Sequence, residues 1–202
     1  MTQVEYFLAI QSPFVYLAGK RPAEIAIKYG VPLRYRPLDM LQLFARTGGK
    51  PRTERHPSRQ DYGLQDRMRL ARKLGVEMVE KPLHWSASTA PASFALIAAQ
   101  AAVDKGAQGD LAGLLLSFGR ALWAEEKDVS DDGVIRAALQ QNGFDPSLAD
   151  RGLLMAAEAY GANLEDAVSA GVFGVPFFVV GQEKFWGQDR LDDLDLHLAG
   201  KL

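Results

Sequence analysis

Strand-like sequence occurs only near the two ends of this chain. Residues 4–9, apolar but for Glu5, and residues 33–38 are predicted as short strands, and residues 172–180 and 184–187 form a second pair around a Gly-containing turn. The long middle carries helix-type apolar periodicity without strands. The economical fold is therefore one α/β domain built from both termini, with an all-helical domain inserted into it.

The predicted domains follow from where these patterns change. Strand, helix and strand occupy the first 38 residues, and such a βαβ unit pairs its strands in parallel. With the C-terminal hairpin and helix, this order resembles thioredoxin-like topology, so we assign residues 1–38 and 166–202 to that domain and 39–165 to the helical insert. The predicted helices cover residues 40–46, 61–74, 92–105, 110–124, 131–141 and 146–160, and a last one runs from Asp189 to about Leu198.

Composition excludes several kinds of chemistry. The chain has 202 residues and no cysteine, so it has no disulfide, zinc–thiolate site, thiol nucleophile or CxxC redox pair, and any thiol chemistry must use a borrowed thiol. A formal net charge of −2 gives no basic stripe for nucleic acid or an anionic membrane. The three histidines, His56, His84 and His197, lie too far apart for metal-ligand spacing. We expect no metal, no nucleic acid and no membrane partner.

The N-terminal sequence bears on location. Its first eight residues are too short and too polar for a secretory signal, and no apolar stretch reaches the ~18 residues of a membrane span. We therefore expect a cytoplasmic protein.

Three segments together resemble one glutathione-using branch of the thioredoxin superfamily. They are Ser-Pro-Phe-Val-Tyr-Leu-Ala at 12–18, Gly-Val-Phe-Gly-Val-Pro-Phe-Phe at 171–178 and Phe-Trp-Gly-Gln-Asp-Arg-Leu at 185–191. The branch contains the 2-hydroxychromene-2-carboxylate isomerases and the kappa-class glutathione transferases, relatives of the DsbA-like proteins. The resemblance covers essentially the whole chain in order and implies a thioredoxin-like fold that uses glutathione as its cofactor.

Ser12 precedes Pro13 at the predicted start of the first helix, where unpaired N–H groups and a partial positive charge stabilise an anion. The resemblance implies that the Ser12 hydroxyl donates a hydrogen bond to the thiolate of bound glutathione and so activates it. Lowering a thiol pKa from about 8.5 to about 6.5 requires about 2.7 kcal/mol. A helix terminus and one hydrogen bond to a charged group supply that much together. The alternative is that Ser12 only caps the helix.

Val175 and Pro176 stand at the start of an apolar strand, where a proline cannot donate to the sheet. A cis peptide bond would resolve this, and thioredoxin-like proteins place such a bond opposite the helix start. The resemblance implies that the free main chain of Val175 pairs with the glutathione backbone, as an added strand would. The alternative is a trans proline on an edge strand.

Gln188, Asp189 and Arg190 follow Gly187 and precede the last helix. The resemblance implies that Gln188 and Asp189 bind the ammonium and carboxylate of the γ-glutamyl end, with Arg190 contributing or buttressing. The alternative is that Asp189 simply caps the helix.

On the substrate side the sequence departs from the family pattern. Phe44 stands where the isomerases usually carry a lysine, and Gly49 or Glu54 where they carry an asparagine. The predicted substrate-binding residues are Phe44, Glu54, Arg55 and Trp85, with Trp85 as a stacking wall for a flat substrate and Lys50, Arg55 and Arg59 as candidate carboxylate binders.

A looser match involves Tyr62, Asp66 and Arg69, which share one face of a predicted helix. They line a cleft or tie the two domains together. An Asp66–Arg69 ion pair at this spacing favours the structural role.

The predicted function is a glutathione-dependent isomerase that acts on 2-hydroxychromene-2-carboxylate or a related aromatic-catabolism intermediate by reversible thiolate addition. Its substrate would be a small aromatic or unsaturated carboxylate. One alternative is a kappa-like glutathione transferase, in which glutathione stays on the product. Another is a noncatalytic thioredoxin-fold protein that binds peptides through Val175. A homodimer is an open alternative to a monomer.

Overall fold

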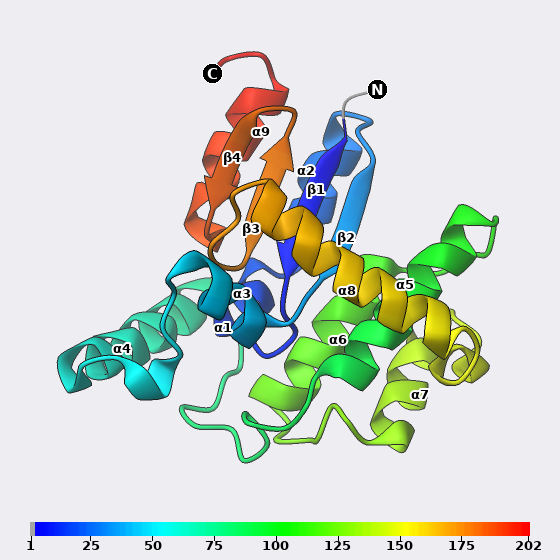
Figure 1. Cartoon of the computed structure of the whole chain (residues 1–202), viewed down its shortest axis with the longest axis horizontal. Coiled ribbons are helices and arrows are strands. Elements are labelled where there is room, and N and C mark those ends of the chain that lie inside the picture. The colour runs from blue at the N-terminus through cyan, green and yellow to red at the C-terminus, as the bar shows by residue number, and fades with distance from the viewer. Residues whose placement is uncertain (1–2) are drawn as a thin grey trace.

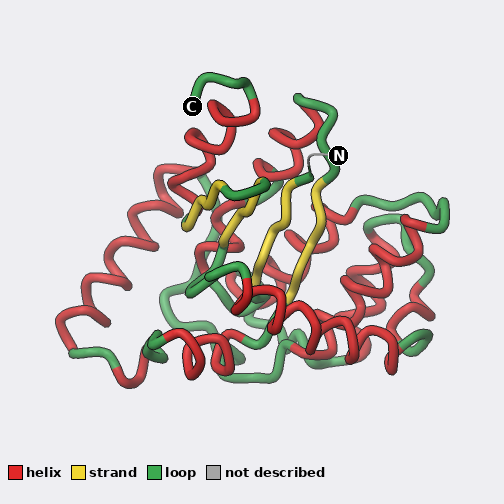
Figure 2. The backbone as a smooth tube through the Cα atoms, turned by 45° about the horizontal axis from the view of Figure 1, so that its top comes forward, coloured by secondary structure: helices red, strands yellow, loops and turns green. Residues whose placement is uncertain are grey.

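A four-stranded mixed sheet forms the centre of the α/β part of the chain. The structure is a computed structural model in which residues 3–202 are described. β1 pairs with β2 in parallel, while the pairs β1–β3 and β3–β4 are antiparallel. Each end of the chain contributes two strands, which confirms the predicted assembly from both termini (Figures 1 and 2). In the order β2-β1-β3-β4, the strands are β2 (Leu33–Pro37), β1 (Val4–Leu8), β3 (Phe177–Val180) and β4 (Glu183–Trp186).

Helices surround this sheet and fill the middle of the chain (Figure 1). The α-helices within residues 3–202 are α1 (Pro13–Ala18), α2 (Arg21–Lys28), α3 (Met40–Thr47), α4 (Pro57–Leu74), α5 (Ala90–Asp104), α6 (Leu111–Trp123), α7 (Asp132–Gln141), α8 (Leu153–Ser169) and α9 (Leu191–Leu198). Short 3₁₀ helices are η1 (Arg52–Glu54), η2 (Pro146–Ala149) and η3 (Gln188–Arg190). α2 and α9 contact each other. α2 also contacts the outer strand β2, and α9 contacts the outer strand β4, while α5 and α8 pack against β2.

The predicted helix at residues 146–160 is wrong in its bounds. It consists of η2 followed by α8, because Gly152 takes a left-handed conformation (φ 78°) between them. α8 then continues to Ser169, so the predicted domain boundary at residue 166 falls inside one helix.

Two C-terminal elements also differ from prediction. The predicted strand 172–180 joins the sheet only from Phe177, since Pro176 has no N–H to donate to a ladder. The last α-helix begins at Leu191 rather than Asp189, because the 3₁₀ helix η3 comes first.

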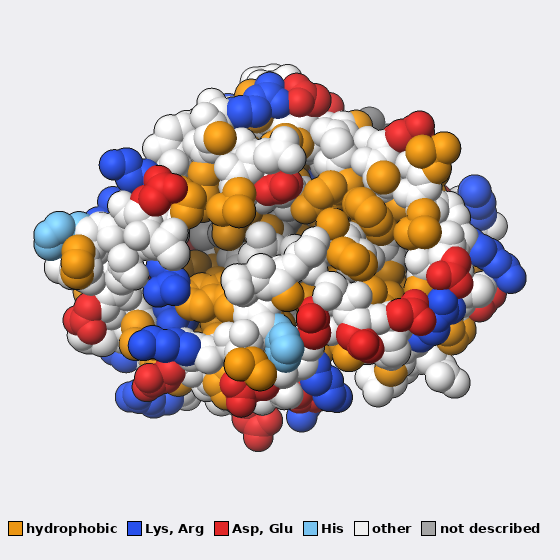
Figure 3. Space-filling view, turned by 60° about the horizontal axis from the view of Figure 1, so that its bottom comes forward, with side chains coloured by type: hydrophobic (Ala, Val, Ile, Leu, Met, Phe, Trp, Pro, Cys, Tyr) orange, Lys and Arg blue, Asp and Glu red, His pale blue; other side chains and the backbone are white. Residues whose placement is uncertain are grey.

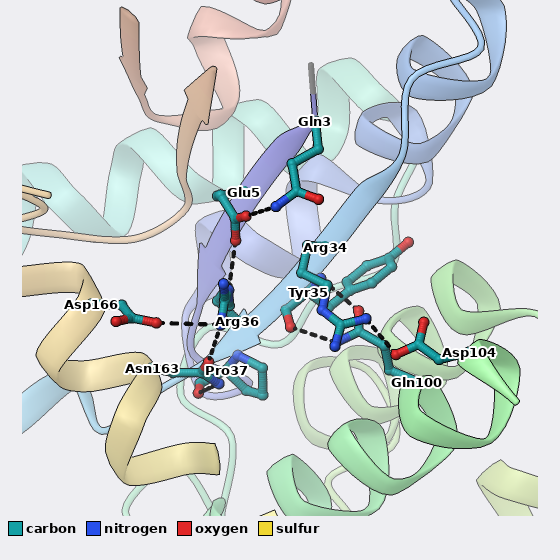
Figure 4. Close-up of polar contacts among 10 residues, drawn as sticks. All are labelled: Gln3, Glu5, Arg34, Tyr35, Arg36, Pro37, Gln100, Asp104, Asn163 and Asp166. Atoms are coloured by element: carbon teal, nitrogen blue, oxygen red, sulfur yellow. Dashed lines mark hydrogen bonds and ion pairs between the residues drawn. The ribbon is translucent and has the colours of Figure 1, made fainter. Parts of the chain in front are cut away.

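The outer edge of β2 is closed by two amide side chains from the inserted helices (Figure 4). Gln100 of α5 accepts from the Tyr35 N–H (2.8 Å) and donates to the Tyr35 carbonyl (3.1 Å). Asn163 of α8 donates to the Pro37 carbonyl (2.9 Å). Both amides are buried. The insert thus supplies hydrogen-bond partners that another strand would otherwise provide.

Tyr16 fixes α1 against the helical insert. Gly119 of α6 makes room for its ring, because a Cβ there would lie 2.7 Å from Tyr16 Cδ2. The Tyr16 hydroxyl donates to the Glu77 carbonyl (2.9 Å). These contacts hold the start of α1 at the joint between sheet and insert.

Candidate functional site

Ser12 lies in a tight turn between β1 and α1. Its N–H donates to the Ala9 carbonyl (2.9 Å), and its carbonyl accepts from the Tyr16 N–H (3.2 Å). The residue is buried, and its hydroxyl makes no capping hydrogen bond. Ser12 is thus the N-cap residue by position, but its hydroxyl is not committed to the helix.

Val175 offers unpaired main-chain groups next to the sheet. The Val175–Pro176 peptide bond is cis, and regular pairing of β3 with β1 begins at Phe177. Among residues 3–202, none pairs with the Val175 N–H or carbonyl, whereas the Pro176 carbonyl accepts from the Gly187 N–H (2.9 Å). An extended peptide can therefore pair with Val175 as a strand would.

The segment after β4 carries the charged end of the site. Gly187 has φ 112° and ψ 155°, and the Asp189 carboxylate folds back over it. Arg190 donates to Asp189 (3.2 Å) and to Asp193 (3.0 Å). The hydrogen bond to Asp189 raises the pKa of Arg190 above its usual range. Asp189 caps neither η3 nor α9, which leaves Arg190 as its buttress and its carboxylate at the surface.

An open cleft of about 1010 Å³ joins these elements. Val175, Pro176, Gln188, Asp189 and Arg190 all line it, so the structure brings together five of the six predicted glutathione-binding residues. The sixth, Ser12, is buried and does not line the cleft, although Phe14 of α1 does. Sequence reasoning assigned no role to other cleft residues, which include Phe14, Leu70 and Lys184.

α4 forms the opposite wall of this cleft. Asp66 lines it, while Arg69 lies over the exposed Tyr62 ring (5.5 Å). The predicted Asp66–Arg69 ion pair is absent among residues 3–202, because Arg69 packs on the aromatic ring instead. Asp66 therefore adds a carboxylate to the cleft lining, which also contains Asp189 and Asp193.

Trp85, from the connection between α4 and α5, contacts the turn that holds Ser12. Its indole N–H donates to the carbonyl of Gln11 (3.2 Å), the residue before Ser12. The Gln11 side chain in turn accepts from the Thr89 hydroxyl (2.7 Å). The peptide unit that enters Ser12 is therefore pinned at its oxygen by Trp85 and at its N–H by the Ala9 carbonyl.

The other predicted substrate residues lie apart from this turn. Phe44 is buried beneath Gly49, with the Arg55 guanidinium 5.9 Å from its ring centroid, so it anchors its own loop. Glu54 is exposed in η1. Arg55 donates to the Lys50 carbonyl (2.9 Å), and burial followed by the charge of Arg59 lowers its pKa.

Arg67 of α4 is a residue that sequence reasoning missed. It is 5% exposed, and its guanidinium carbon lies 5.0 Å from the Trp85 ring centroid. The Arg52 guanidinium carbon lies 4.6 Å from the same ring. The available signal was the position of Arg67 four residues before the buried Ala71, on the apolar face of α4. On the face turned forward in Figure 3, Lys and Arg side chains border the hydrophobic middle on the side of α4.

Two structural findings concern ion and membrane binding. In the part of the chain that the structure describes, no three His, Asp or Glu side chains gather as a metal site would require. No helix among residues 3–202 is both long and apolar enough to cross a bilayer.

Comparisons with known proteins agree with this architecture. Residues 3–199 match the family model of the DsbA-like thioredoxin domain. A 2-hydroxychromene-2-carboxylate isomerase from Pseudomonas putida is 27% identical over 191 residues, covering 93% of this chain and 90% of the relative. One from Sphingobium xenophagum is 27% identical over 203 residues, covering 96% and 97%.

Solved structures support the same fold. A structure of 2-hydroxychromene-2-carboxylate isomerase superposes with a TM-score of 0.78 at 24% identity, over 98% of this chain and 94% of the other. The cytosolic disulfide reductase DsbM from Pseudomonas aeruginosa, in a structure with GSH, gives 0.66 at 16% identity over 98% of both chains.

Proposed function

Because this chain belongs to the DsbA-like thioredoxin domain family and has isomerases among its relatives, we propose that it is a glutathione-dependent isomerase. Its substrate would be 2-hydroxychromene-2-carboxylate or a related small aromatic or unsaturated carboxylate. The observation that carries the proposal is the cleft in which Val175 and Pro176 meet Gln188, Asp189 and Arg190 beside α1. The proposal includes a cytoplasmic location, and a homodimer stays a prediction.

The cleft residues fit a zwitterionic tripeptide. The unpaired main chain of Val175 would hold its backbone. Asp189, kept in place by Arg190, would pair with the γ-glutamyl ammonium, and Gln188 would bind the neighbouring carboxylate. Asp66 and Lys184 add one carboxylate and one ammonium to the lining. This mixed charge suits a ligand that carries both signs.

When bound, glutathione supplies a thiolate that adds reversibly to an electrophilic carbon and leaves after the substrate has rearranged. Ser12 would donate its hydroxyl proton in a hydrogen bond to that sulfur and so favour the charged form. α1 has only six residues, so we assign most of the stabilisation to the hydroxyl, at about 1.5–3 kcal/mol. Trp85 would hold the Gln11–Ser12 peptide so that the hydroxyl keeps its direction.

The first experiment measures glutathione binding by calorimetry and turnover of 2-hydroxychromene-2-carboxylate with and without glutathione. Turnover that needs glutathione and does not consume it supports the isomerase. Stoichiometric consumption with an electrophile would identify a transferase instead. Absence of glutathione binding, together with binding of unfolded peptides, would identify the noncatalytic alternative.

Ser12→Ala tests the assigned role. Loss of one hydrogen bond to a charged group should raise the pKa of the bound thiol by about 1–2 and slow turnover, with a nearly unchanged melting temperature. The ultraviolet absorbance of the thiolate, followed against pH, reports the pKa. The exposed Ser86, changed to Ala, serves as the control. An unaltered thiol pKa in Ser12→Ala would remove Ser12 from the mechanism.

A further inference from the structure

We propose that Arg52 and Arg67, which both lie over the Trp85 ring, form the site that binds the carboxylate of a planar substrate. This inference rests on the proposed function, because it assigns the substrate end of the same site. It replaces Lys50, Arg55 and Arg59, the carboxylate binders predicted from the sequence, with two arginines that the fold brings to one ring.

Arg67 is a buried cation that forms no ion pair among residues 3–202, although the charge of Glu80 acts on it. Its side chain donates to the carbonyls of Glu80 (2.7 Å) and Gly63 (3.4 Å), and its Nε has no partner among residues 3–202. A guanidinium has five N–H donors, and carbonyls satisfy its hydrogen bonds without neutralising its charge. A buried charge left in this state destabilises a protein unless something neutralises it. The chain therefore leaves part of this guanidinium's hydrogen-bonding capacity unused.

Arg52 brings a second positive charge to the same ring. The only polar partner of its guanidinium among residues 3–202 is the Gln60 side chain (3.3 Å). Burial, followed by the charge of Arg52, lowers the pKa of Arg67. Two like charges held on one indole repel each other, and an anion between them would reverse that repulsion. By contrast, Arg36 and Arg136 each pair with carboxylates of the chain itself.

The location and the chemistry specify the ligand. Trp85 donates to the carbonyl of Gln11, the residue before Ser12, so the ring that the two arginines cover contacts the Ser12 turn directly. Guanidinium groups bind carboxylates through parallel N–H donors, and an indole face favours a flat partner. A planar aromatic or conjugated carboxylate satisfies both conditions, with its unsaturated carbon directed toward the activated thiol.

The test uses trans-cinnamate as a planar carboxylate and cinnamamide as its neutral counterpart. Binding to the whole protein is measured by tryptophan fluorescence and calorimetry. Arg52→Gln should weaken cinnamate binding at least about tenfold, the loss expected for a charge-assisted hydrogen bond, and leave cinnamamide binding unchanged. Arg72→Gln removes an equal charge from an exposed position of α4 and should bind cinnamate like the parent protein. Arg67→Lys, checked first by thermal melting, should bind it with intermediate affinity.

Equal cinnamate affinity in Arg52→Gln and the parent, an equal loss in Arg72→Gln, or no cinnamate binding by the parent would overturn the assignment. In turnover, Arg52→Gln should raise the KM of the anionic substrate while kcat and its pH profile stay the same. Glutathione binding separates this inference from the proposed function. Parent protein that binds cinnamate through Arg52 but no glutathione would refute the proposed function and retain the anion site.

Discussion

Gly187 allows the strongest test of the cleft geometry, because its backbone conformation and its neighbour both exclude a side chain. Its φ of 112° and ψ of 155° lie in a region that essentially only glycine occupies. A Cβ added there would collide with Asp189 Oδ1 at far less than van der Waals contact. Gly187→Ala should therefore strain the backbone and displace the Asp189 carboxylate from the cleft.

The backbone term alone is about 1–3 kcal/mol of unfolding free energy. For a chain of this size, each kcal/mol corresponds to about 2–4 °C in melting temperature. The Asp189–Arg190 ion pair adds little to this figure, because both side chains are more than half exposed. Displacement of Asp189 should appear in glutathione binding instead, as a loss of about tenfold or more for one charge-assisted contact.

The assay pairs thermal melting with glutathione calorimetry, and Gly181→Ala is the matched control. Gly181 also has positive φ (60°), but a Cβ there meets nothing within 4 Å. Its replacement should cost about 1–2 kcal/mol of stability and leave glutathione affinity unchanged. A Gly187→Ala protein with the parent's melting temperature and the parent's glutathione affinity would refute the reasoning.

Three further changes test other contacts. Trp85→Phe keeps a ring but removes the N–H that donates to Gln11, so we expect about 1 kcal/mol lower stability by thermal melting and a lower kcat with little change in KM. Gln100→Leu leaves the Tyr35 N–H and carbonyl unpaired in the core and should cost about 2–4 kcal/mol by urea denaturation. Tyr6→Phe removes a buried hydroxyl without a partner and should raise stability by about 1 kcal/mol. Burial also raises the pKa of Tyr6, so above its unfolded pKa of about 10 the unfolded chain ionises at this residue before the folded chain does, and the free energy of unfolding falls as pH rises. Tyr6→Phe lacks this loss and should stay folded at higher pH by circular dichroism.

The predictable parts of this fold are those encoded locally. The apolar runs around Tyr6 and Phe178 indicate strands by composition alone, and they do pair side by side with stacked rings 4.6 Å apart. Gly19 and Pro22 indicate the break in the first helical region, where φ of 58° at Gly19 separates α1 from α2. Such signals depend only on neighbouring residues, so one sequence suffices to read them.

The remaining features depend on contacts between distant segments. Arginine is a residue type usually found at the surface, and only the approach of Trp85 and Glu80 makes Arg67 a buried cation. Phe44 aligns with a substrate position, yet Gly49 covers it because the loop folds back on its own helix. The start of α8 depends on the backbone conformation of Gly152 rather than on the periodicity around it. No local pattern specifies these choices.

The insert is coupled to the sheet at two places, one of which is the turn that holds Ser12. Gln100 and Asn163 close the edge of β2, while Trp85 and Thr89 bind Gln11 at the end of β1. Without the insert, the Tyr35 and Pro37 groups at this edge would need new partners, and the peptide before Ser12 would lose one of its two hydrogen bonds. A small movement of Trp85, in the connection over residues 75–89, would therefore tilt the Gln11–Ser12 peptide and with it change the direction of the Ser12 hydroxyl. The residues that recognise a substrate at Trp85 would thus also set the direction in which Ser12 acts.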